Sequence, residues 1–335
     1  MLNTQPINIF WFRRDLRLND NHGLFRALNA DLPVIGIFIF DKTILSKLDN
    51  PLDKRVSFIH QQVNKIKKET EISGSTLITR YGNPAEVFSE LTDQLNINAV
   101  YANEDYEPLA IQRDKSISQL LSANGIGFHL FKDQVIFSKQ DIIKPNGEPY
   151  TIFTPYSKKW LARANSEPNV PGSFASEKLC GNFLKLPPEP IIALEAIGFK
   201  EVRTNVMPLK DDPKILQQYA NARDKLYADG TSHSGVHLRF GTVSVRDLVR
   251  KGFRFSPTFL SELIWREFFQ SILFHFPQVG RGASFKPAYD NIAWRNDEEE
   301  FEKWCEGKTG YPVVDAGMRE LSESGFMHNR ARMIT

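Results

Sequence analysis

A carboxylate and a guanidinium share one face of a strongly apolar segment. Glu262 and Arg266 lie four residues apart, so a helix would place them side by side. Exposed pairs of this kind contribute little to stability. Here the neighbours are leucine, isoleucine and phenylalanine, and burying an unpaired charge is costly, so we expect both groups to contact a partner or ligand. Trp265 offers a flat face for stacking a planar ring, although an isolated aromatic residue more often belongs to a core.

Glycine and hydroxyl residues crowd the segment from Asp229 to Gly235, just before a helix predicted to begin at Val236. Backbone N–H groups at a helix start, with Ser and Thr hydroxyls beside them, can hold a phosphate group. An ordinary Ser/Thr N-cap with turn glycines uses the same residue types. Taken alone, the segment favours the simple N-cap by roughly three to one.

Polar groups also cluster near the end of the sequence. Asn329 and Arg332 are three residues apart and Asn329 and Met333 are four apart, so a helix would show amide, guanidinium and thioether groups on one face. An amide donates and accepts hydrogen bonds, which suits the edge of a flavin or a pyrimidine. His328 is better interpreted as a hydrogen-bonded core histidine.

A run of cations between residues 239 and 254 is opposed by Asp247 alone. Such a run could contact phosphates. A solvated helix face explains it equally well. The cations are Arg239, Arg246, Arg250, Lys251 and Arg254.

The elements that must position these residues begin with an alternating pattern. Before residue 132, short apolar runs alternate with amphipathic segments, as expected for strands buried on both faces of a parallel sheet and the helices between them. This alternation predicts an α/β doubly wound parallel-sheet N-terminal domain over 5–133. We expect strands within 7–12, 33–40, 77–79, 99–102 and 128–131. We expect helices over 56–66, after the N-cap Asn83, and over 109–121.

The loop after the first predicted strand runs from Arg13 to Asn21 and is not a Gly-x-Gly-x-x-Gly loop, so a conventional dinucleotide site is not supported there.

The residue pattern changes after residue 133. Seven prolines between 165 and 213 interrupt long helices and central strands, and we assign 134–213 to an interdomain linker. Beyond it, the apolar helix predicted over 259–274 indicates an all-α domain over 214–335.

Composition excludes several classes of protein. Hydrophobic residues make up 41% and charged residues 24% of the 335 residues, which is typical of a folded soluble protein. The net charge of +2 does not by itself identify a nucleic-acid partner. Two distant cysteines argue against a disulfide framework and a structural zinc site, and we expect no metal. No leader sequence and no apolar run of membrane-spanning length is visible.

Several segments resemble, in the same order, the DNA photolyase/cryptochrome family, and most closely its class I cyclobutane pyrimidine dimer enzymes. The resemblance extends over almost the whole chain. It rests on Trp11–Arg17, Asp20-Asn21, Tyr106–Pro108, Arg113-Asp114, Phe153–Pro155, Trp160, Tyr219, Thr231-Ser232, Glu262–Phe268 and Trp304–Met333.

This resemblance implies a deoxyribodipyrimidine photolyase, which repairs cyclobutane pyrimidine dimers by light-driven electron transfer from excited reduced FAD. The cofactor supplies the chemistry, and the protein positions it and excludes water. A dimer is poorly stacked and can be flipped out of the duplex into a pocket. The implied partner is UV-damaged DNA, and we expect a monomer in the cytoplasm.

The same resemblance assigns roles to individual residues. FAD is expected to contact Tyr219, Thr231, Ser232, His233, Ser234, Gly235, Arg266, Phe326, Asn329 and Arg332. Catalytic contacts to the lesion are expected from Glu262, Trp265, Asn329 and Met333. DNA contacts are expected from Arg223, Glu262, Trp265, Phe269, Asn329 and Arg330. Trp294 resembles the outermost tryptophan of the chain that photoreduces the flavin.

Some positions depart from the family pattern. Ser234-Gly235 stands where many members have Leu-Ser, and Phe326 replaces a common tryptophan. Leu109-Ala110 stands where folate-antenna enzymes carry a polar pair, which argues against a folate antenna and leaves the identity of any second antenna chromophore open. Further flavin contacts and two electron-transfer tryptophans of the family would lie beyond Thr335, so we expect the FAD-binding domain to be incomplete at its C-terminus.

Two alternatives accompany the repair hypothesis. A cryptochrome-type blue-light sensor would share the fold and the flavin residues. Met333 stands where single-strand-type cryptochromes tend to carry Gln, and Asn329 stands where (6-4) photolyases and animal cryptochromes tend to carry His, and both favour repair. The other alternative is an inactive fragment that lacks the rest of the flavin site.

Overall fold

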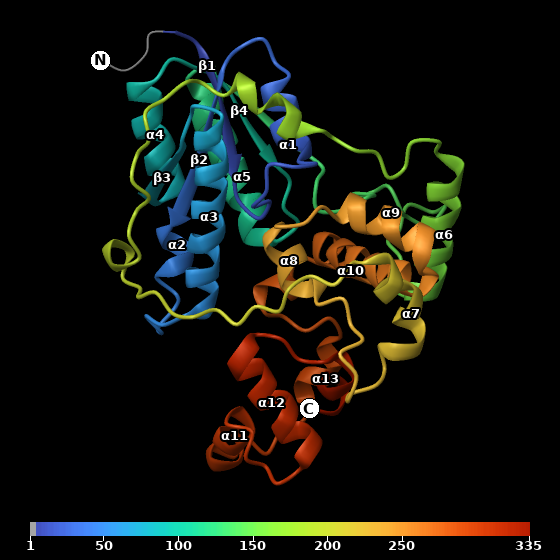
Figure 1. Ribbon diagram of the computed structural model, residues 1–335. Coiled ribbons are helices and arrows are strands. Elements are labelled where there is room, and N and C mark those ends of the chain that lie inside the picture. The colour runs from blue at the N-terminus through green and yellow to red at the C-terminus, as the bar shows by residue number, and fades with distance from the viewer. Residues whose placement is uncertain (1–4) are drawn as a thin grey trace.

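Two parts make up the molecule, a layered α/β part and a helical part (Figure 1). The computed structural model describes residues 5–335. Five parallel strands form one sheet in the order β3-β2-β1-β4-β5. The strands are β1 (Ile7–Phe12), β2 (Val34–Asp41), β3 (Leu77–Gly82), β4 (Ile97–Asn103) and β5 (Gly127–Phe131). The five predicted strands and the doubly wound sheet are confirmed.

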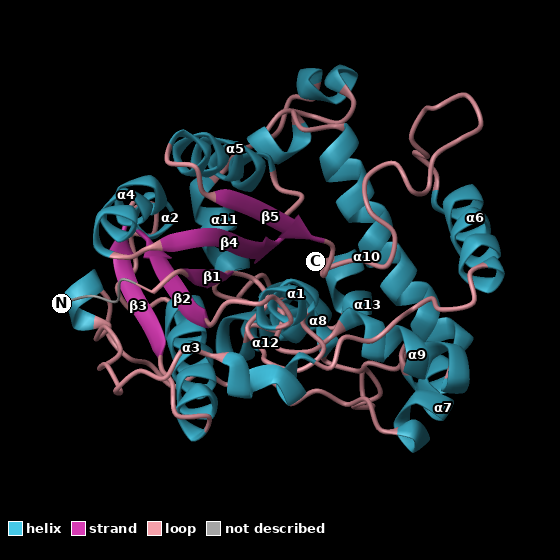
Figure 2. Cartoon of the chain, turned by 90° about the horizontal axis from the view of Figure 1, so that it is seen from above, coloured by secondary structure: helices cyan, strands magenta, loops and turns pink. Residues whose placement is uncertain are grey.

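Helices cover both faces of this sheet (Figure 2). Side chains alternate along β1, so Phe10 and Phe12 pack with α1 and α3, while Ile9 and Trp11 pack with α4 and α5. The predicted N-cap Asn83 is confirmed, because its side chain accepts a hydrogen bond from the Ala85 N–H. The helices are α1 (His22–Leu28), α2 (Lys42–Leu45), α3 (Lys54–Ile72), α4 (Pro84–Gln94) and α5 (Pro108–Ala123).

The helical part has its core between α6, α7, α9 and α10, where large apolar side chains from each helix are buried together. The helices are α6 (Phe153–Ser166), α7 (Pro213–Ala222), α8 (Ser234–Phe240), α9 (Val245–Phe255), α10 (Pro257–His275), α11 (Glu298–Cys305), α12 (Pro312–Ser324) and α13 (Asn329–Ile334). Short 3-10 helices span Ser176–Asn182, Glu195–Ile197, Val279–Arg281 and Pro287–Asn291. Within residues 5–335, every helix is too short or too polar to cross a membrane.

Residues 134–213, assigned above to a linker, contribute to both cores. Tyr156 and Trp160 of α6 are buried in the helical core. Phe183 and Leu194 are buried against the sheet, and the Leu184 N–H donates to the Val34 carbonyl at 2.8 Å. The division at 133 and 213 stays a prediction, but this segment ties the two parts together by packing.

Buried ionic side chains join the two parts. The Asp133 carboxylate lies 2.7 Å from Arg17 Nη2 and 2.8 Å from Arg246 Nη2. Asp20 accepts from Arg246 Nε at 3.0 Å and from Ser244 Oγ at 2.6 Å. Burial alone would raise the pKa of Asp133, but the two guanidinium groups hold it well below its usual range. Arg246 of the cation run is therefore buried at this junction, and neither a phosphate contact nor a solvated face describes it.

The backbones of the two parts also touch at Gly241, which follows α8. The Leu16 N–H donates to the Phe240 carbonyl at 3.0 Å. Gly241 has a φ of 66°, and a Cβ added there would lie 2.2 Å from the Arg14 carbonyl oxygen. Only glycine allows both this backbone conformation and this close approach.

Glu267 fastens α10 to the segment that follows β5. Its carboxylate accepts from the Ile136 N–H at 2.6 Å, the Phe137 N–H at 3.0 Å and Trp160 Nε1 at 2.6 Å. Desolvation raises the pKa of Glu267 from 4.5 to about 7, although these hydrogen bonds oppose the shift. One buried carboxyl group thus holds both the β5 exit and α6 against α10.

Replacing Gly241 with alanine is expected to lower the free energy of unfolding by more than ~2 kcal/mol, because the clash adds to the left-handed backbone cost. Gly125→Ala is the matched control, since Gly125 has a φ of 71° and no heavy atom lies within 4 Å of its added Cβ. Urea unfolding of both variants measures the difference. Equal losses would contradict a close approach between the two parts.

Glu267→Gln is expected to change how stability depends on pH. Because the folded state raises the pKa from 4.5 to about 7, the folded protein holds this proton more tightly than the unfolded chain. The stability that this proton binding adds to the folded state is complete below about pH 4.5 and is lost as the pH rises through about 7. The stability of the wild type relative to the variant should therefore fall by up to ~3 kcal/mol between about pH 4.5 and about pH 8.

Chemical denaturation at several pH values tests this, with Glu298→Gln, an exposed change on α11, as the control. Parallel pH profiles for wild type and Glu267→Gln would show that Glu267 does not titrate in this range.

Candidate functional site

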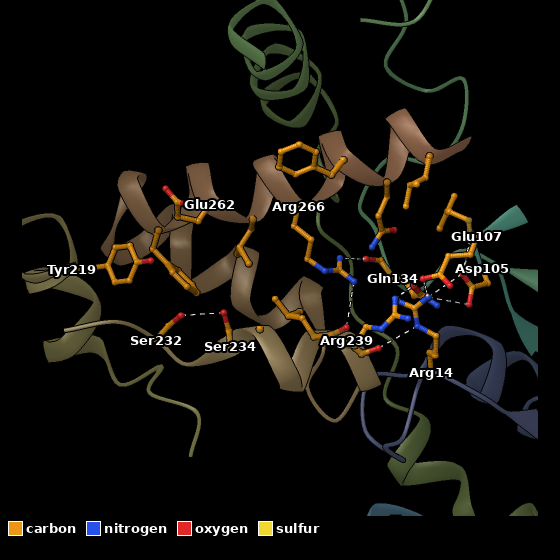
Figure 3. Close-up of a pocket in the computed structure, with 18 residues that line it drawn as sticks. Arg14, Asp105, Glu107, Gln134, Tyr219, Ser232, Ser234, Arg239, Glu262 and Arg266 are labelled. Atoms are coloured by element: carbon orange, nitrogen blue, oxygen red, sulfur yellow. Dashed lines mark hydrogen bonds and ion pairs between the residues drawn. The ribbon is translucent and has the colours of Figure 1, made fainter. Parts of the chain in front are cut away.

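A cavity of about 470 Å³ lies where α8 and α10 meet the α/β part. Figure 3 shows Tyr219 and Glu262 at one end, Arg14, Asp105 and Glu107 at the other, and Arg266 between them. One face of α10 supplies much of the wall, at spacings of three and four residues that keep these side chains on one side of the helix. The α10 residues are Glu262, Leu263, Arg266, Phe269, Gln270 and Leu273.

The carboxyl ends of three neighbouring strands supply the far end of the cavity. Arg14 follows β1, Asp105 and Glu107 follow β4, and Gln134 follows β5. Arg14 Nη1 lies 2.7 Å from Glu107, and Arg239 of α8 pairs with the same carboxylate. Ligands of doubly wound sheets commonly bind at this edge, where the strand order reverses.

The segment before α8 lines the near end with hydroxyl groups. Ser232, Ser234 and Gly235 face the cavity, and Ser232 Oγ lies 3.0 Å from Ser234 Oγ. The helix begins at Ser234 and not at Val236, two residues earlier than predicted. His233 occupies the N-cap position with a φ of 52° and makes no side-chain capping bond, so the ordinary Ser/Thr N-cap favoured above is wrong.

Arg266 brings a positive charge into the middle of the cavity. Its guanidinium donates to the Gln134 carbonyl at 2.5 Å and to the Leu238 carbonyl at 3.3 Å. Among residues 5–335 no carboxylate lies within ion-pairing distance of it. Burial, and then the nearby charges of Arg14 and Arg239, lower the pKa of Arg266 to about 10, so it remains protonated at neutral pH. An unneutralised guanidinium favours an anionic ligand group.

Tyr219 and Phe259 add aromatic surface opposite α8. Their rings meet edge to face, with centroids 5.4 Å apart. Burial, and then the charge of Glu262, raises the pKa of Tyr219 to about 12, so its hydroxyl is neutral and can donate a hydrogen bond. The cavity therefore combines aromatic faces, hydroxyl groups and a guanidinium without a carboxylate partner among residues 5–335, which suits a ligand with flat rings and phosphate groups.

Seven predicted site residues line this cavity together. They are Tyr219, Ser232, Ser234, Gly235, Glu262, Arg266 and Phe269. Arg223 lies at its rim and pairs with Glu262. Thr231 and His233 adjoin the lining residues in sequence, and the His233 ring packs edge-on against Phe326, with centroids 4.9 Å apart.

Trp265 turns away from this lining. Its ring stacks on Phe153 of α6, with centroids 3.6 Å apart and planes 8° apart. Phe269 stacks on it less closely, with centroids 5.6 Å apart. The expected flat stacking surface therefore exists, but here α6 covers one side of it.

The predicted residues of α13 lie outside the cavity lining. Asn329 Nδ2 is 3.9 Å from Met333 Sδ, which confirms that these side chains share a helix face. Arg332 and Met333 are exposed, and Arg330 pairs with Asp224 at 2.9 Å. His328 caps α13 by accepting from the Arg330 N–H. Its other ring nitrogen, Nε2, has no hydrogen-bond partner within residues 5–335. The expected hydrogen-bonded histidine is therefore bonded at one of its two ring nitrogens.

Trp294 is also separate from the cavity. It is 72% exposed and makes no ring contact with another aromatic residue in the described part of the chain.

Sequence reasoning missed the far end of the cavity. Arg14 and Glu107 belong to motifs quoted above, but nothing in their spacing indicates a contact with Arg239 or proximity to Arg266. Polar residues that directly follow parallel strands converge on one edge of the sheet, and this position could have indicated the far end of the cavity.

Comparisons with known proteins agree with this geometry. The family model for DNA photolyase matches residues 8–172, and the model for the FAD binding domain of DNA photolyase matches residues 259–335. A deoxyribodipyrimidine photo-lyase of Halobacterium salinarum is 32% identical over 359 residues, covering 98% of this chain and 74% of the relative.

Solved structures give the same result. A class III photolyase from Agrobacterium tumefaciens superposes with a TM-score of 0.83 at 26% identity, covering all of this chain and 72% of that one. An archaeal photolyase from Sulfolobus tokodaii, solved with two FAD molecules, gives a TM-score of 0.79 at 30% identity over 98% of this chain and 73% of its own. The chain belongs to the DNA photolyase family.

Proposed function

We propose that this protein is a deoxyribodipyrimidine photolyase, which uses FAD and light to repair cyclobutane pyrimidine dimers in DNA. The observation that carries the proposal is the cavity itself. It joins aromatic surface, hydroxyl groups and the unneutralised guanidinium of Arg266 in one space. The match to an FAD-binding domain of DNA photolyase and the curated photo-lyase relatives support it.

The residues present suit FAD. Arg266 and the hydroxyls of Ser232 and Ser234 would hold the phosphate groups, through charge and hydrogen bonds. Tyr219 would contribute a neutral hydroxyl and its ring face. The family resemblance adds Thr231, His233, Gly235, Phe326, Asn329 and Arg332. FAD, when bound, supplies the light-driven electron donation that splits the cyclobutane ring.

The protein's own residues bind and orient the lesion. Glu262 lines the cavity and offers a carboxyl group to the polar edge of a flipped pyrimidine dimer. Phe269, next to Trp265 in the aromatic stack on α10, is 57% exposed and offers ring surface at the cavity wall. By resemblance, Trp265, Asn329 and Met333 complete these contacts, Arg223 and Arg330 bind the DNA backbone, and Trp294 relays electrons to the flavin.

The neighbour that holds two FAD molecules supports a second chromophore in this protein as well, of unidentified chemistry. A monomer acting on UV-damaged DNA in the cytoplasm is part of the same proposal. A cryptochrome-type sensor would use the same cavity, and the residue types at Asn329 and Met333 favour repair over it.

Light-dependent repair tests the proposal directly. Purified protein reconstituted with FAD and reduced should lower the dimer content of a UV-irradiated oligonucleotide under blue light and not in the dark, as measured by chromatography of the hydrolysed DNA. Protein that retains FAD but leaves dimers intact in light would overturn it.

Arg266→Leu is expected to weaken FAD binding by about ten- to a hundredfold, because one charge-assisted contact is removed from a desolvated site. Arg266→Lys should restore part of the affinity, since it keeps the charge but not the planar fork. Arg281→Leu, at an exposed arginine with no carboxylate partner in the described chain, is the control. Flavin fluorescence titration measures all three, and equal affinities for both leucine variants would contradict this role.

A further inference from the structure

Four charged side chains of alternating sign form a chain at the rim of the cavity. Glu262 of α10 pairs with Arg223, the C-cap residue that follows α7. Arg223 Nε lies 3.4 Å from Asp224, and Asp224 lies 2.9 Å from Arg330 Nε of α13. We call these residues the rim chain. Their charges sum to zero, so in the free protein each guanidinium has a carboxylate of the same chain as its partner.

The rim chain is accessible from solvent. The side chains of Glu262 and Arg223 are 38% and 27% exposed, and those of Asp224 and Arg330 are 48% and 41% exposed. Ion pairs at such exposure are weak and exchange readily with other partners. Glu262 alone of the four also lines the cavity, so it belongs to both the rim and the pocket.

Asp224 is ionised at neutral pH. The hydrogen bond from Arg330, aided by the charge of Arg223, lowers the pKa of Asp224 below its usual range. Asp224 is not among the residues that the family resemblance identified. Asp224 lies between Arg223 and Arg330, so it competes with any incoming anion for these two arginines.

We propose that Arg223 exchanges partners when DNA binds, leaving Glu262 for a backbone phosphate and so releasing the Glu262 carboxyl group toward the lesion pocket. The inference rests on the proposed function only for the identity of the ligand. A phosphate also carries negative charge, and it offers a guanidinium a better bidentate geometry than the single Glu262 oxygen that Arg223 holds in the free protein.

The exchange couples backbone binding to lesion recognition. In the free protein Arg223 Nη1 donates to Oε1 of Glu262, so this oxygen becomes free for a contact in the pocket only when the pair breaks. Other groups around Glu262 do not replace that partner, because Tyr219 of α7 is neutral and Arg266 is occupied by two carbonyl groups. Undamaged DNA and damaged DNA both offer Arg223 a phosphate, but only a flipped lesion gives the released Glu262 oxygen a new partner. The rim chain therefore favours damaged DNA.

Substitutions of Glu262 and Asp224 separate binding of the DNA backbone from recognition of the lesion. Glu262→Gln removes the competitor for Arg223, so undamaged DNA should bind about two- to fivefold more tightly, the range set by one exposed ion pair. Affinity for a dimer-containing oligonucleotide should rise less or fall, because the carboxyl contact is lost. Asp224→Asn should raise affinity for both DNAs by the same factor and leave their ratio unchanged.

Fluorescence anisotropy with matched oligonucleotides at low salt measures these affinities on the FAD-containing protein. Glu298→Gln, on the exposed face of α11, makes the same change in net charge and is the control. The gain from Glu262→Gln should disappear when Arg223→Gln is present as well. No gain over the Glu298 control, or a gain that persists without Arg223, would overturn the exchange. Light-dependent repair by the wild type is read separately, so a failed exchange leaves the proposed function standing.

Discussion

The buried junction of Arg17, Asp133, Arg246 and Asp20 is the constraint on which the rest of the structure depends. Three of these residues belong to the α/β part and Arg246 belongs to α9 of the helical part, and all four are removed from water together. Loss of one member would leave an uncompensated buried charge, which costs far more than any exposed ion pair. The cavity takes its walls from both parts, and its lining residue Gln134 directly follows Asp133, so the junction sets how the two walls face each other.

A second constraint works through neighbouring residues of α10. Arg266 donates to the Gln134 carbonyl, and Glu267 accepts from the N–H groups of Ile136 and Phe137. Successive residues on a helix point about 100° apart, so one charge faces the cavity while the other faces the buried side. Arg266 and Glu267 therefore both bind the short segment after β5, and these contacts fix the position of Arg266 in the cavity.

The sequence was sufficient for elements whose signal is local. Apolar runs located the five strands, and Asn83-Pro84 marked a helix start, because burial period and capping depend on residues close in the chain. Glu262 and Arg266 were placed on one helix face for the same reason, and both line the cavity. The far end of the cavity was not predicted, since Arg14 and Arg239 meet only through tertiary packing.

Other differences have equally physical causes. His233 displaced the expected N-cap because the backbone adopts a left-handed conformation there, which residue type alone does not reveal. The stacking of the Trp265 ring on Phe153 was not predicted, because Phe153 lies more than a hundred residues earlier in the chain. Arg246 was grouped with surface cations because the aspartates that bury it are distant in sequence.

The interleaved packing of residues 134–213 has a consequence for synthesis. Phe183, Leu194, Ile197 and Phe199 complete the core against the sheet, yet they follow α6, which belongs to the helical core. As the chain leaves the ribosome, the α/β layer lacks part of its apolar cover until residue 199 has emerged. Vectorial folding of an N-terminal unit is the usual order for multidomain chains. Here the nascent α/β layer keeps an exposed apolar face until residues 183–199 pack on it. During the same interval α6 has left the ribosomal tunnel but has no partner helix.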